Sequence, residues 1–507
     1  MALEKTELKG ALPRLFLLSF STFVVCVPAA FTQVISFDLM LDMDSFSGND
    51  YAWTFPFFVA GECASMAFSI CMLDHFGRKR PYLVGSLLFL AGTAFCALCT
   101  EMTPFIGFRF VQGFGAGIII VACIAQIYYE VKDKQNRYAA NGVMSLGFGV
   151  GMLCGIFAGK LALETIGWNE AFWIVFFMQA VVTYPALQVF DKGDRSEMPA
   201  DWPGAIILTV WAGLFVLLLE KIYLDWPLSS PEALMGISGV LLLFLLFIFV
   251  ELRHKHSVFH RKVDSGKMIT GLLIYVVLLG LIDMAAVGYM VKIALFTYKM
   301  SVLEAAPYFV VLVIGAAITA VMVTKTIDKT GHRFWLLLSA VLSPIALLSM
   351  LLVSPDDPYV LFAGHLFILG LAIGCLVSML NGAIQNRLDE HNNGAVMSFA
   401  IMMRTVALWL GYNFYQLVSD GYMSDKIGDV INHWNSVLPF DLPSTSALAN
   451  LLITPLGDAL RLIPGISDEI AKYFAEGVGE AMIFGAVAFP LVAIPVAFLL
   501  IKKERIL

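Results

Sequence analysis

Long apolar runs, separated by short polar segments, extend over almost the whole chain. A helix needs about 20 apolar residues to cross the hydrocarbon core of a membrane. Runs of about this length occupy residues 15–38, 51–73, 81–99, 104–129, 139–162, 171–190, 203–222, 233–252, 268–296, 305–324, 335–353, 359–385, 396–417 and 479–501. The pattern therefore predicts an all-α polytopic membrane protein with fourteen transmembrane helices.

The composition supports this prediction and excludes other classes of protein. Of the 507 residues, 59% are hydrophobic and only 14% are charged, against about 25% charged residues in soluble proteins. So few charges could not cover soluble domains, and intrinsic disorder needs the opposite balance. A net charge of −7 argues against a nucleic-acid binder. All eight cysteines lie in apolar runs, which indicates buried thiols rather than disulfides or zinc ligands.

The basic residues indicate an orientation, because cytoplasmic loops of membrane proteins are rich in Lys and Arg. With the N-terminus inside the cell, the predicted inner segments hold 23 of the 32 Lys and Arg residues. We therefore expect a multi-pass protein of the cell membrane with both termini in the cytoplasm and an uncleaved first helix. The one long outer loop is 418–478. Its amphipathic stretch, 446–462, is expected to lie on the membrane or cap the outer mouth, with a re-entrant segment as the alternative.

Two cytoplasmic turns have similar sequences, which indicates an internal repeat. The first reads DHFGRKR at 74–80 and the second reads DKTGHR at 328–333. Secondary transporters are commonly built from repeated halves that move about a site at the membrane midplane. The repeat predicts an N-terminal six-helix bundle at 1–191 and a C-terminal one at 267–507, with an inserted helix pair and cytoplasmic loops at 192–266.

The apolar run 139–162 has glycine at every fourth position, at 147, 151, 155 and 159. Small residues in this spacing form one stripe along a helix and let a neighbouring backbone approach closely. We therefore expect this helix to pack tightly against another.

Four motifs together resemble the major facilitator superfamily of transporters, in its fourteen-helix drug:proton antiporter branch. The turn at 74–80 is similar to the superfamily's loop signature, and RFVQGFG at 109–115 is similar to its fourth-helix signature. DWPG at 201–204 resembles the start of the inserted pair, and GAVMS at 394–398 resembles the beginning of the branch's thirteenth helix. The resemblance spans nearly the whole chain and implies secondary active transport by alternating access.

The resemblance also implies a role for the two turns. The carboxylate of Asp74 is expected to lie against the N-terminal end of the helix at 396–417, where the helix dipole stabilises negative charge. This contact would hold the cytoplasmic side shut in one state. The alternative is that the basic residues only fix the topology. The gate residues expected from the two turns are Asp74, Gly77, Arg78, Arg80, Asp328, Gly331 and Arg333.

Ionisable residues inside the predicted helices are the candidates for proton coupling, because a charge in the hydrocarbon core is costly. Glu62 is near the centre of its apolar run, and Asp283 is near the middle of another. The alternatives are an ion pair or hydrogen bond between domains for Glu62 and local helix pairing for Asp283. Arg109 cannot shed its charge. It is therefore expected to take part in coupling or substrate placement, or else to be held in a buried structural pair.

Polar residues in the apolar runs are candidates for the wall of a substrate cavity. Lys292 follows Asp283 by nine residues, which places it on another face of the same helix. Its side chain is expected to extend toward the membrane surface or to bind an anionic substrate. The uncharged candidates can instead form hydrogen bonds between helices. The full set is Gln33, Arg109, Gln112, Tyr289, Lys292, Asn381, Gln385 and Arg404.

Three functions remain open on this basis. The first is proton-coupled efflux of amphiphilic organic compounds by a multidrug-type antiporter. The second is uptake or exchange of a metabolite or organic anion, which Lys292 and the absence of an acidic residue from the first helix favour. The third is a membrane sensor or intramembrane enzyme, which the short predicted tails of about 14 and 6 residues disfavour.

The sequence has no phosphate-binding Gly-Lys-Ser/Thr loop and no nucleotide domain, and its histidines at 254–260 lie in a basic loop typical of a solvated inner segment. We therefore expect no catalysis, no cofactor, no metal and no nucleic-acid partner. The expected partners are a small amphiphilic organic substrate, the proton as coupling ion and the lipid bilayer. The chain is expected to act as a monomer, with periplasmic adaptor proteins as optional partners.

Overall fold

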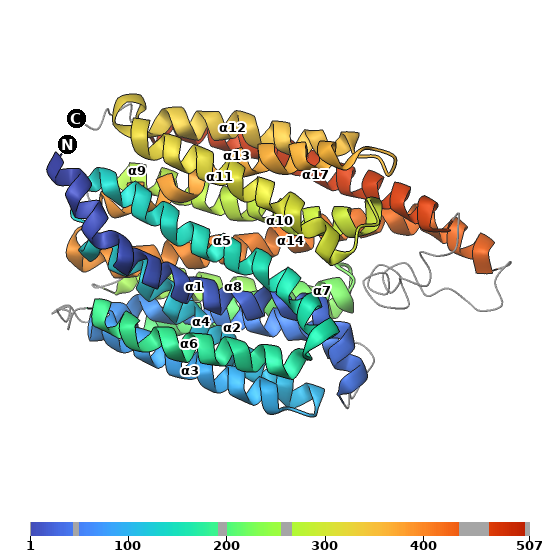
Figure 1. The fold of residues 1–507 in the computed structure, drawn as a ribbon, viewed down its shortest axis with the longest axis horizontal. Coiled ribbons are helices and arrows are strands. Elements are labelled where there is room, and N and C mark those ends of the chain that lie inside the picture. Colours follow the sequence, from blue (N-terminus) through green and yellow to red (C-terminus); the bar gives the residue numbers. More distant parts are fainter. Residues whose placement is uncertain (1, 44–49, 191–199, 255–265, 436–465, 502–507) are drawn as a thin grey trace.

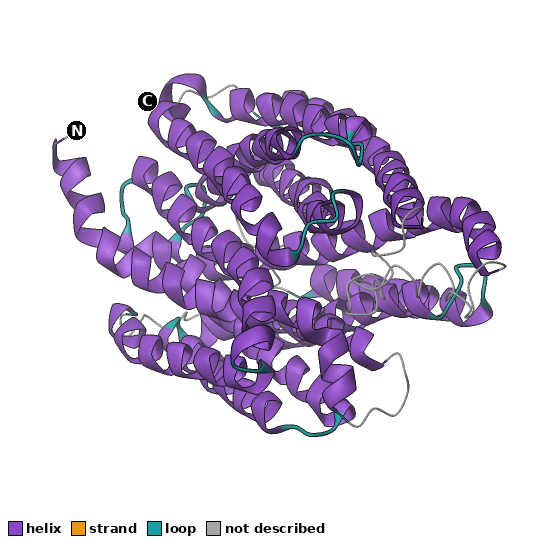
Figure 2. Cartoon of the chain, turned by 45° about the vertical axis from the view of Figure 1, so that its right-hand side comes forward, coloured by secondary structure: helices purple, strands orange, loops and turns teal. Residues whose placement is uncertain are grey.

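The computed structural model describes residues 2–43, 50–190, 200–254, 266–435 and 466–501, and every regular element in this part of the chain is a helix (Figures 1 and 2). Fourteen segments are long and apolar enough to cross a membrane. Thirteen of them centre on one α-helix each: α1 (Ala2–Asp42), α2 (Thr54–Phe76), α3 (Lys79–Leu98), α4 (Met102–Glu130), α5 (Lys134–Thr165), α6 (Trp168–Val189), α7 (Trp202–Leu224), α8 (Pro231–Arg253), α11 (Val302–Thr330), α12 (His332–Ser349), α13 (Tyr359–Gln385), α14 (Glu390–Asn435) and α17 (Ile466–Leu499).

The ninth membrane segment is not a uniform α-helix. It consists of α9 (Gly266–Leu278), the π-helical turn η2 (Leu279–Met284), α10 (Ala285–Lys292) and a second π-helical turn, η3 (Ile293–Thr297). Two short 3₁₀ turns complete the described elements, η1 (Asp50–Trp53) before α2 and η4 (Met350–Leu352) after α12. π-Helical turns inside α-helices are rare and often occur at functional sites.

The predicted number of spans is confirmed, because each predicted apolar run overlaps a different one of these fourteen segments over most of its length. The predicted outer segment at 418–478 is helical at both of its ends. α14 continues to Asn435, and α17 already begins at Ile466. Both extensions are more polar than the spans that they continue, so the hydrophobic pattern does not indicate that the helices continue there. The amphipathic stretch at 446–462 lies outside the described residues.

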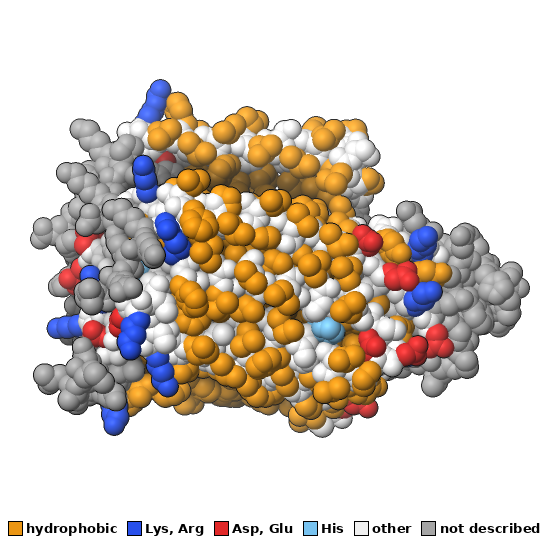
Figure 3. Space-filling model, turned by 90° about the horizontal axis from the view of Figure 1, so that it is seen from above, with side chains coloured by type: hydrophobic (Ala, Val, Ile, Leu, Met, Phe, Trp, Pro, Cys, Tyr) orange, Lys and Arg blue, Asp and Glu red, His pale blue; other side chains and the backbone are white. Residues whose placement is uncertain are grey.

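The chain is a multi-pass membrane protein with two different ends. Both termini lie at one end of the helix bundle, called the terminal end below, and the opposite end is called the far end (Figure 1). Hydrophobic side chains cover the region between the ends, and Lys and Arg gather near the terminal end (Figure 3). Individual apolar residues are strongly exposed, such as Val181 and Leu352, each at 75%. Lipid can solvate such a surface.

The helices form two groups with a helix between them. α1 to α4 and α6 of the first group lie in the lower part of Figure 1, α9 to α13 and α17 of the second group lie in the upper part, and α5 of the first group and α14 of the second cross the middle, where the groups meet. α7 packs against α2 of the first group and α14 of the second, and α8 packs on α7. The inserted helix α7 therefore contacts both groups.

The glycine stripe of α5 lies against α1, as expected for tight helix packing. A Cβ atom built on Gly151 would be 2.6 Å from the carbonyl oxygen of Phe23 and 2.9 Å from the Cβ of Cys26. Glycines 147, 155 and 159 meet α1 in the same way at residues 19 to 31. The prediction of close packing is confirmed. Because the glycine stripe faces α1, the opposite face of α5 points away from α1.

The two repeated turns also share a backbone conformation. Gly77 has φ 71° and ψ −165°, and Gly331 has φ 74° and ψ 167°. A positive φ of this size is unfavourable for residues with a Cβ atom. Glycine is therefore required at the same place in both turns, which supports the inferred repeat.

We predict that Gly151→Ala destabilises the protein by about 1–3 kcal/mol, the range for an added methyl group that forces packed atoms apart. Gly149 is the matched control, because a Cβ at this position of the same helix meets nothing within 4 Å. The Gly149→Ala variant should melt at or slightly above the wild-type temperature, since alanine favours helix more than glycine. Thermal unfolding in detergent measures both. Equal melting temperatures for the two variants would contradict the tight α1–α5 contact.

Candidate functional site

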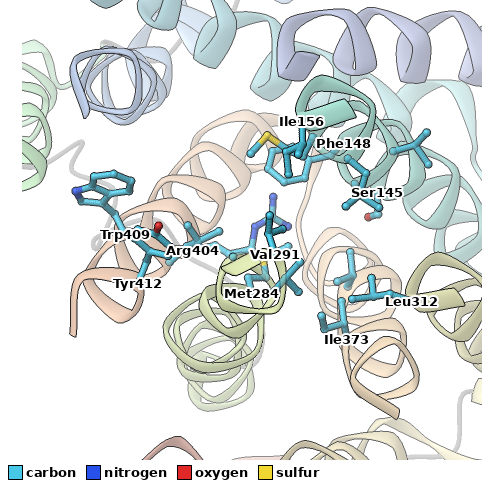
Figure 4. A pocket seen from close by; sticks show the side chains of 18 of the residues that line it. Ser145, Phe148, Ile156, Met284, Val291, Leu312, Ile373, Arg404, Trp409 and Tyr412 are labelled. Carbon is cyan, nitrogen blue, oxygen red and sulfur yellow. The ribbon is translucent and has the colours of Figure 1, made fainter. Parts of the chain in front are cut away.

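A cavity of about 400 Å³ lies between the two groups of helices. Its walls come mainly from α4 and α5 on one side, α10, α11, α13 and α14 on the other, and η1, α2 and α7. Apolar side chains such as Phe148, Ile156, Leu312 and Ile373 make up much of the surface (Figure 4). Its size is within the range of cavities that hold drug-sized molecules.

Three charged side chains, among the described residues, line this cavity: Glu220, Lys292 and Arg404. Lys292 and Arg404 were predicted at the wall from the sequence, and the predicted Asn381 lines it too. Arg404 extends from α14 toward α5, with its guanidinium 5.8 Å from the ring centroid of Phe148 (Figure 4). The cavity thus has an apolar surface with a few widely placed charges.

The other predicted cavity residues do not contribute to the wall in this conformation. Tyr289 and Gln385 are buried outside it, at 1% and 0% exposure. Arg109 and Gln112 are buried inside the first group of helices. The side chain of Gln33 lies outside the described residues.

Arg109 ties three elements of the first group together. Its Nε donates to the carbonyl oxygen of Thr54, at 3.2 Å, and one terminal nitrogen donates to Pro28 O at 3.0 Å and Thr32 Oγ1 at 2.7 Å. The other terminal nitrogen donates to Gln112 Oε1. Neutral oxygens of α1, α2 and α4 therefore accept four hydrogen bonds from the guanidinium. The sequence left open whether Arg109 takes part in coupling or substrate placement, or is held in a buried structural pair. Its contacts agree with the structural role, with neutral oxygens in place of a charged partner.

Glu62 and Arg404 bring opposite charges together across the two groups. Glu62 on α2 is 7% exposed and interacts electrostatically with Arg404 on α14, which is 6% exposed. No hydrogen bond to the Glu62 carboxylate occurs within the described residues. A charge pair that spans both groups responds to any change in their separation.

Asp283 lies in the π-helical turn η2 and is fully buried, away from the cavity wall. One carboxylate oxygen accepts a hydrogen bond from Ser343 Oγ at 3.0 Å, and the other has no partner among the described atoms. No basic side chain of the described part pairs with it. A charged carboxylate in such a place is costly, and it is therefore the least compensated acid of the predicted set.

A second group of charges lies toward the far end, and the sequence interpretation missed most of it. Lys292 on α10 interacts electrostatically with Glu220 on α7 and Asp420 on α14. Tyr223 Oη donates to Asp420 Oδ2 at 2.7 Å. Glu220 stands next to Lys221 near the end of an apolar run, where charged residues are ordinary, so the sequence did not single it out. Asp420 lies beyond the predicted span.

The first repeated turn packs against the second group of helices. Asp74 is buried in the last turn of α2, and a Cβ built on Gly394 would lie 3.6 Å from its Oδ1. The carboxylate therefore lies beside the first turns of α14, where the resemblance implies it. Its role in gating stays a prediction.

The basic residues of the first turn differ in their surroundings. Arg78 is buried, donates from Nε to Gln126 Oε1 at 2.7 Å, and lies 3.1 Å above the ring centroid of Tyr129. Arg80 is exposed. Only Arg78 is therefore placed to position neighbouring helices.

The second repeated turn makes contacts of another kind. Arg333 donates from Nε to the carbonyl oxygen of Ala497 at 3.0 Å, and thereby satisfies the end of α17. Asp328 is half-buried, and Gly331 is buried. His332, beside this glycine, shares a 2.8 Å hydrogen bond with Tyr138 Oη of α5.

Buried amides connect the two groups at the terminal end. Gln385 of α13 donates to the carbonyl oxygen of Ile124 at 3.0 Å and accepts from Asn141 Nδ2 at 2.8 Å. Asn393 of α14 donates to the carbonyl oxygen of Ala125 at 3.1 Å. These bonds join the two groups at the terminal end. Asn141 was missed because its partner is 244 residues away, although an asparagine inside an apolar run is itself a signal.

Metal binding has no support in the described residues, where no group of three His, Cys, Asp or Glu side chains could hold an ion.

Comparisons with known proteins agree with this architecture. The family model described as Major Facilitator Superfamily matches residues 15–412. "Multidrug resistance protein 3" of Bacillus subtilis is 23% identical over 78% of this chain and 77% of its own. "Riboflavin transporter RibZ" of Clostridioides difficile is 23% identical over 72% of this chain and 78% of its own. The crystal structure of the human organic anion transporter MFSD10 superposes with a TM-score of 0.56, at 12% identity, over 96% of this chain and 99% of that one.

We predict that Gln385→Leu opens the terminal end, because it removes two hydrogen bonds between the groups and leaves Asn141 with an unsatisfied amide. Spin labels at Lys134→Cys and Lys329→Cys, both exposed at this end on α5 and α11, report the separation in a background without the eight native cysteines. A longer distance population should appear in the Gln385→Leu protein.

The matched control is His365→Leu on the same helix, since His365 Nδ1 bonds to Ser349 Oγ at 2.9 Å within the second group. This variant should keep the wild-type distance distribution. An unchanged distribution for Gln385→Leu would show that its bonds do not hold the terminal end closed.

Proposed function

The chain belongs to the major facilitator superfamily, and from this premise we propose that it exports amphiphilic organic compounds from the cell in exchange for protons. Proteins of this superfamily are transporters rather than enzymes. Relatives named for multidrug resistance and multidrug transport, both from Bacillus subtilis, support export of such compounds. They are 23% and 22% identical to this chain.

The observation that carries the proposal is the cavity between the two groups of helices. A mainly apolar wall with three charged side chains suits a molecule that is itself largely apolar with few polar groups. Such a wall binds by contact area and selects weakly for exact shape, which fits transport of a range of amphiphiles.

The proposed direction depends on orientation. The enrichment of Lys and Arg at the terminal end supports a cytoplasmic location of both termini in the cell membrane. On this orientation we infer that the amide contacts of Gln385 and Asn393 hold the cytoplasmic side closed, and that this conformation belongs to the outward-facing part of the proposed cycle. A single chain encloses the cavity, which supports transport by a monomer, with periplasmic adaptors as optional partners.

The proposed cycle moves the bundle at 1–191 against the bundle at 267–507. Opening to the cytoplasm breaks the amide contacts at the terminal end and separates Asp74 from the start of α14. The residues of both repeated turns, named above as gate residues, would stabilise one of the two states. Arg109 acts as a positioning residue, because it holds α1, α2 and α4 together while this group moves as a unit.

We assign proton coupling to Asp283 and Glu62. Asp283 has one unpartnered carboxylate oxygen and no basic partner in the described part, so it gains most from binding a proton. Glu62 interacts with Arg404, a residue of the cavity wall, which links its charge state to the site where substrate binds. Protonation of Glu62 would release Arg404 from this interaction.

The alternative is a carrier for uptake or exchange of a metabolite or organic anion. Lys292 and Arg404 in the wall and the relative named as a riboflavin transporter favour it. Direction separates the two functions. In everted membrane vesicles with an acid interior, a proton-driven exporter accumulates a fluorescent amphiphile until nigericin collapses the gradient. Release of a preloaded compound driven by the same gradient would support the uptake carrier instead.

We predict that Asp283→Asn keeps exchange of labelled for unlabelled substrate but abolishes accumulation driven by the pH gradient, because the amide cannot carry a proton. Glu62→Gln should reduce accumulation less completely. Asp356→Asn is the control, since this aspartate is exposed between α12 and α13 and should transport like wild type. Full gradient-driven accumulation in both single variants and in the double variant would remove the two residues from coupling.

A further inference from the structure

The far-end charges form a cluster that the proposed proton mechanism does not use. Lys292 on α10 is half-buried at the cavity wall, and Glu220 of the inserted helix α7 is 8% exposed on the same wall. Asp420 of α14 is the second carboxylate that interacts with Lys292. One ammonium group thus faces two carboxylates. The other basic residue of the wall is Arg404. It lies eight residues before Tyr412, a neighbour of Lys292, on α14, which is roughly 12 Å along the helix axis.

Aromatic rings surround the same ammonium. Lys292 Nζ lies 5.2 Å from the ring centroid of Tyr289 and 5.4 Å from that of Tyr412. Trp409 stacks on Tyr412 with ring centroids 5.8 Å apart and planes inclined by 22°. Tyr412 and Trp409 both line the cavity (Figure 4). Cages of aromatic faces are the usual way in which proteins bind organic ammonium groups.

Two polar groups of this cluster, the hydroxyl of Tyr289 and the carboxylate of Glu220, can form further hydrogen bonds. The hydroxyl of Tyr289 is buried and has no hydrogen-bond partner among the described atoms. No side chain in the described ranges donates a hydrogen bond to the carboxylate of Glu220, and no basic group there lies within ion-pair distance of it. Asp420, by contrast, accepts a hydrogen bond from Tyr223. The acid at the cavity wall is therefore the less satisfied of the two.

We propose that this cluster binds the cationic group of an organic substrate, and that Lys292 is a tethered cation which the substrate displaces. The proposal rests on the proposed function, since it names the substrate class of the same cavity. The cluster has two carboxylates for one ammonium, and a second cation beside Glu220 would stabilise the ionised form of the carboxylate that Lys292 does not neutralise. The flexible stem of lysine lets its ammonium leave the rings when a substrate ammonium enters. An anionic group at the same place would meet Glu220 and Asp420.

The inserted helix thereby acquires a role in recognition. Glu220 reaches the cavity from α7, while its neighbour Lys221 faces a separate crevice lined by Trp53 and Trp226. The Nζ of Lys221 lies 5.6 Å and 5.8 Å from these two rings, and it pairs with Asp225. Two adjacent charged residues of one helix therefore line two different hollows, and only Glu220 belongs to the cavity.

The test is equilibrium binding of dyes to the purified full-length protein in detergent, by fluorescence anisotropy. Ethidium is the cationic probe, Nile red the uncharged one and fluorescein the anionic one. Lys292→Met should lower the Kd for ethidium at least threefold, because it removes the competing cation. Glu220→Gln should raise this Kd at least tenfold. Neither substitution should change the Kd for Nile red more than twofold.

Lys221→Met is the matched control, since it removes a cation held between two aromatic rings one residue from Glu220, and its Kd values should equal those of wild type. Lys292→Arg, which keeps the charge, should not reproduce the tighter binding of ethidium and serves if the methionine variant does not fold. Unchanged ethidium binding in both Lys292→Met and Glu220→Gln would overturn the proposal. Loss of fluorescein binding in Lys292→Met, with ethidium binding unchanged, would identify an anion site and overturn it equally.

These outcomes are separable from those of the proposed function. If amphiphiles are transported in vesicles but Glu220→Gln has no effect on ethidium binding, the cation site is rejected and the proposed export function is kept. If the predicted binding pattern is found but no gradient-driven transport occurs, the cation site is kept and the proposed export function is rejected.

Discussion

A charge in the hydrocarbon core of a membrane needs a partner, and this requirement organises the interior of the chain. Arg109 meets it with neutral oxygens from three helices and becomes a fixed joint of the first group. Glu62 and Arg404 meet it only across the boundary between the two groups. Asp283 meets it incompletely, with a single hydrogen bond from Ser343. The cost of burying a charge therefore gives Arg109 a structural role. It makes the other three side chains sensitive to movement or protonation.

The mobile boundary depends on how tightly each group is packed within itself. The glycine stripe of α5 brings its backbone against α1, and Gly77 and Gly331 give both repeated turns the same sharp path. The groups are joined at the terminal end by hydrogen bonds, among them those of the buried amides around Gln385, the bond between Tyr138 and His332 and the bond from Tyr128 to the carbonyl oxygen of Leu388. Close backbone packing inside each group, with hydrogen bonds concentrated between the groups at one end, is an arrangement that permits rigid-body movement. α7 contacts both groups and adds Glu220 to the cavity they share.

The sequence alone predicts most of this fold, because apolar runs of sufficient length must be helices in a membrane. It fails where a helix leaves the membrane, as α14 does up to Asn435, since polarity no longer distinguishes helix from loop there. Within the site, Lys292, Asn381 and Arg404 were found because polar residues in apolar runs are conspicuous. Glu220 was missed beside Lys221 at a span end, and the pairing of Asn141 with Gln385 needs contacts between distant segments that no local pattern contains.

The central claim is that substrate and proton compete through buried carboxylates of one chain. Its most direct test is the change in free proton concentration when a saturating amphiphile is added to the purified protein in weakly buffered detergent solution near neutral pH. The account predicts proton release by the wild-type protein, and little or no release by the Glu62→Gln, Asp283→Asn double variant at an equal amount of bound substrate. Substrate binding without proton release in wild type, or undiminished release in the double variant, would contradict it.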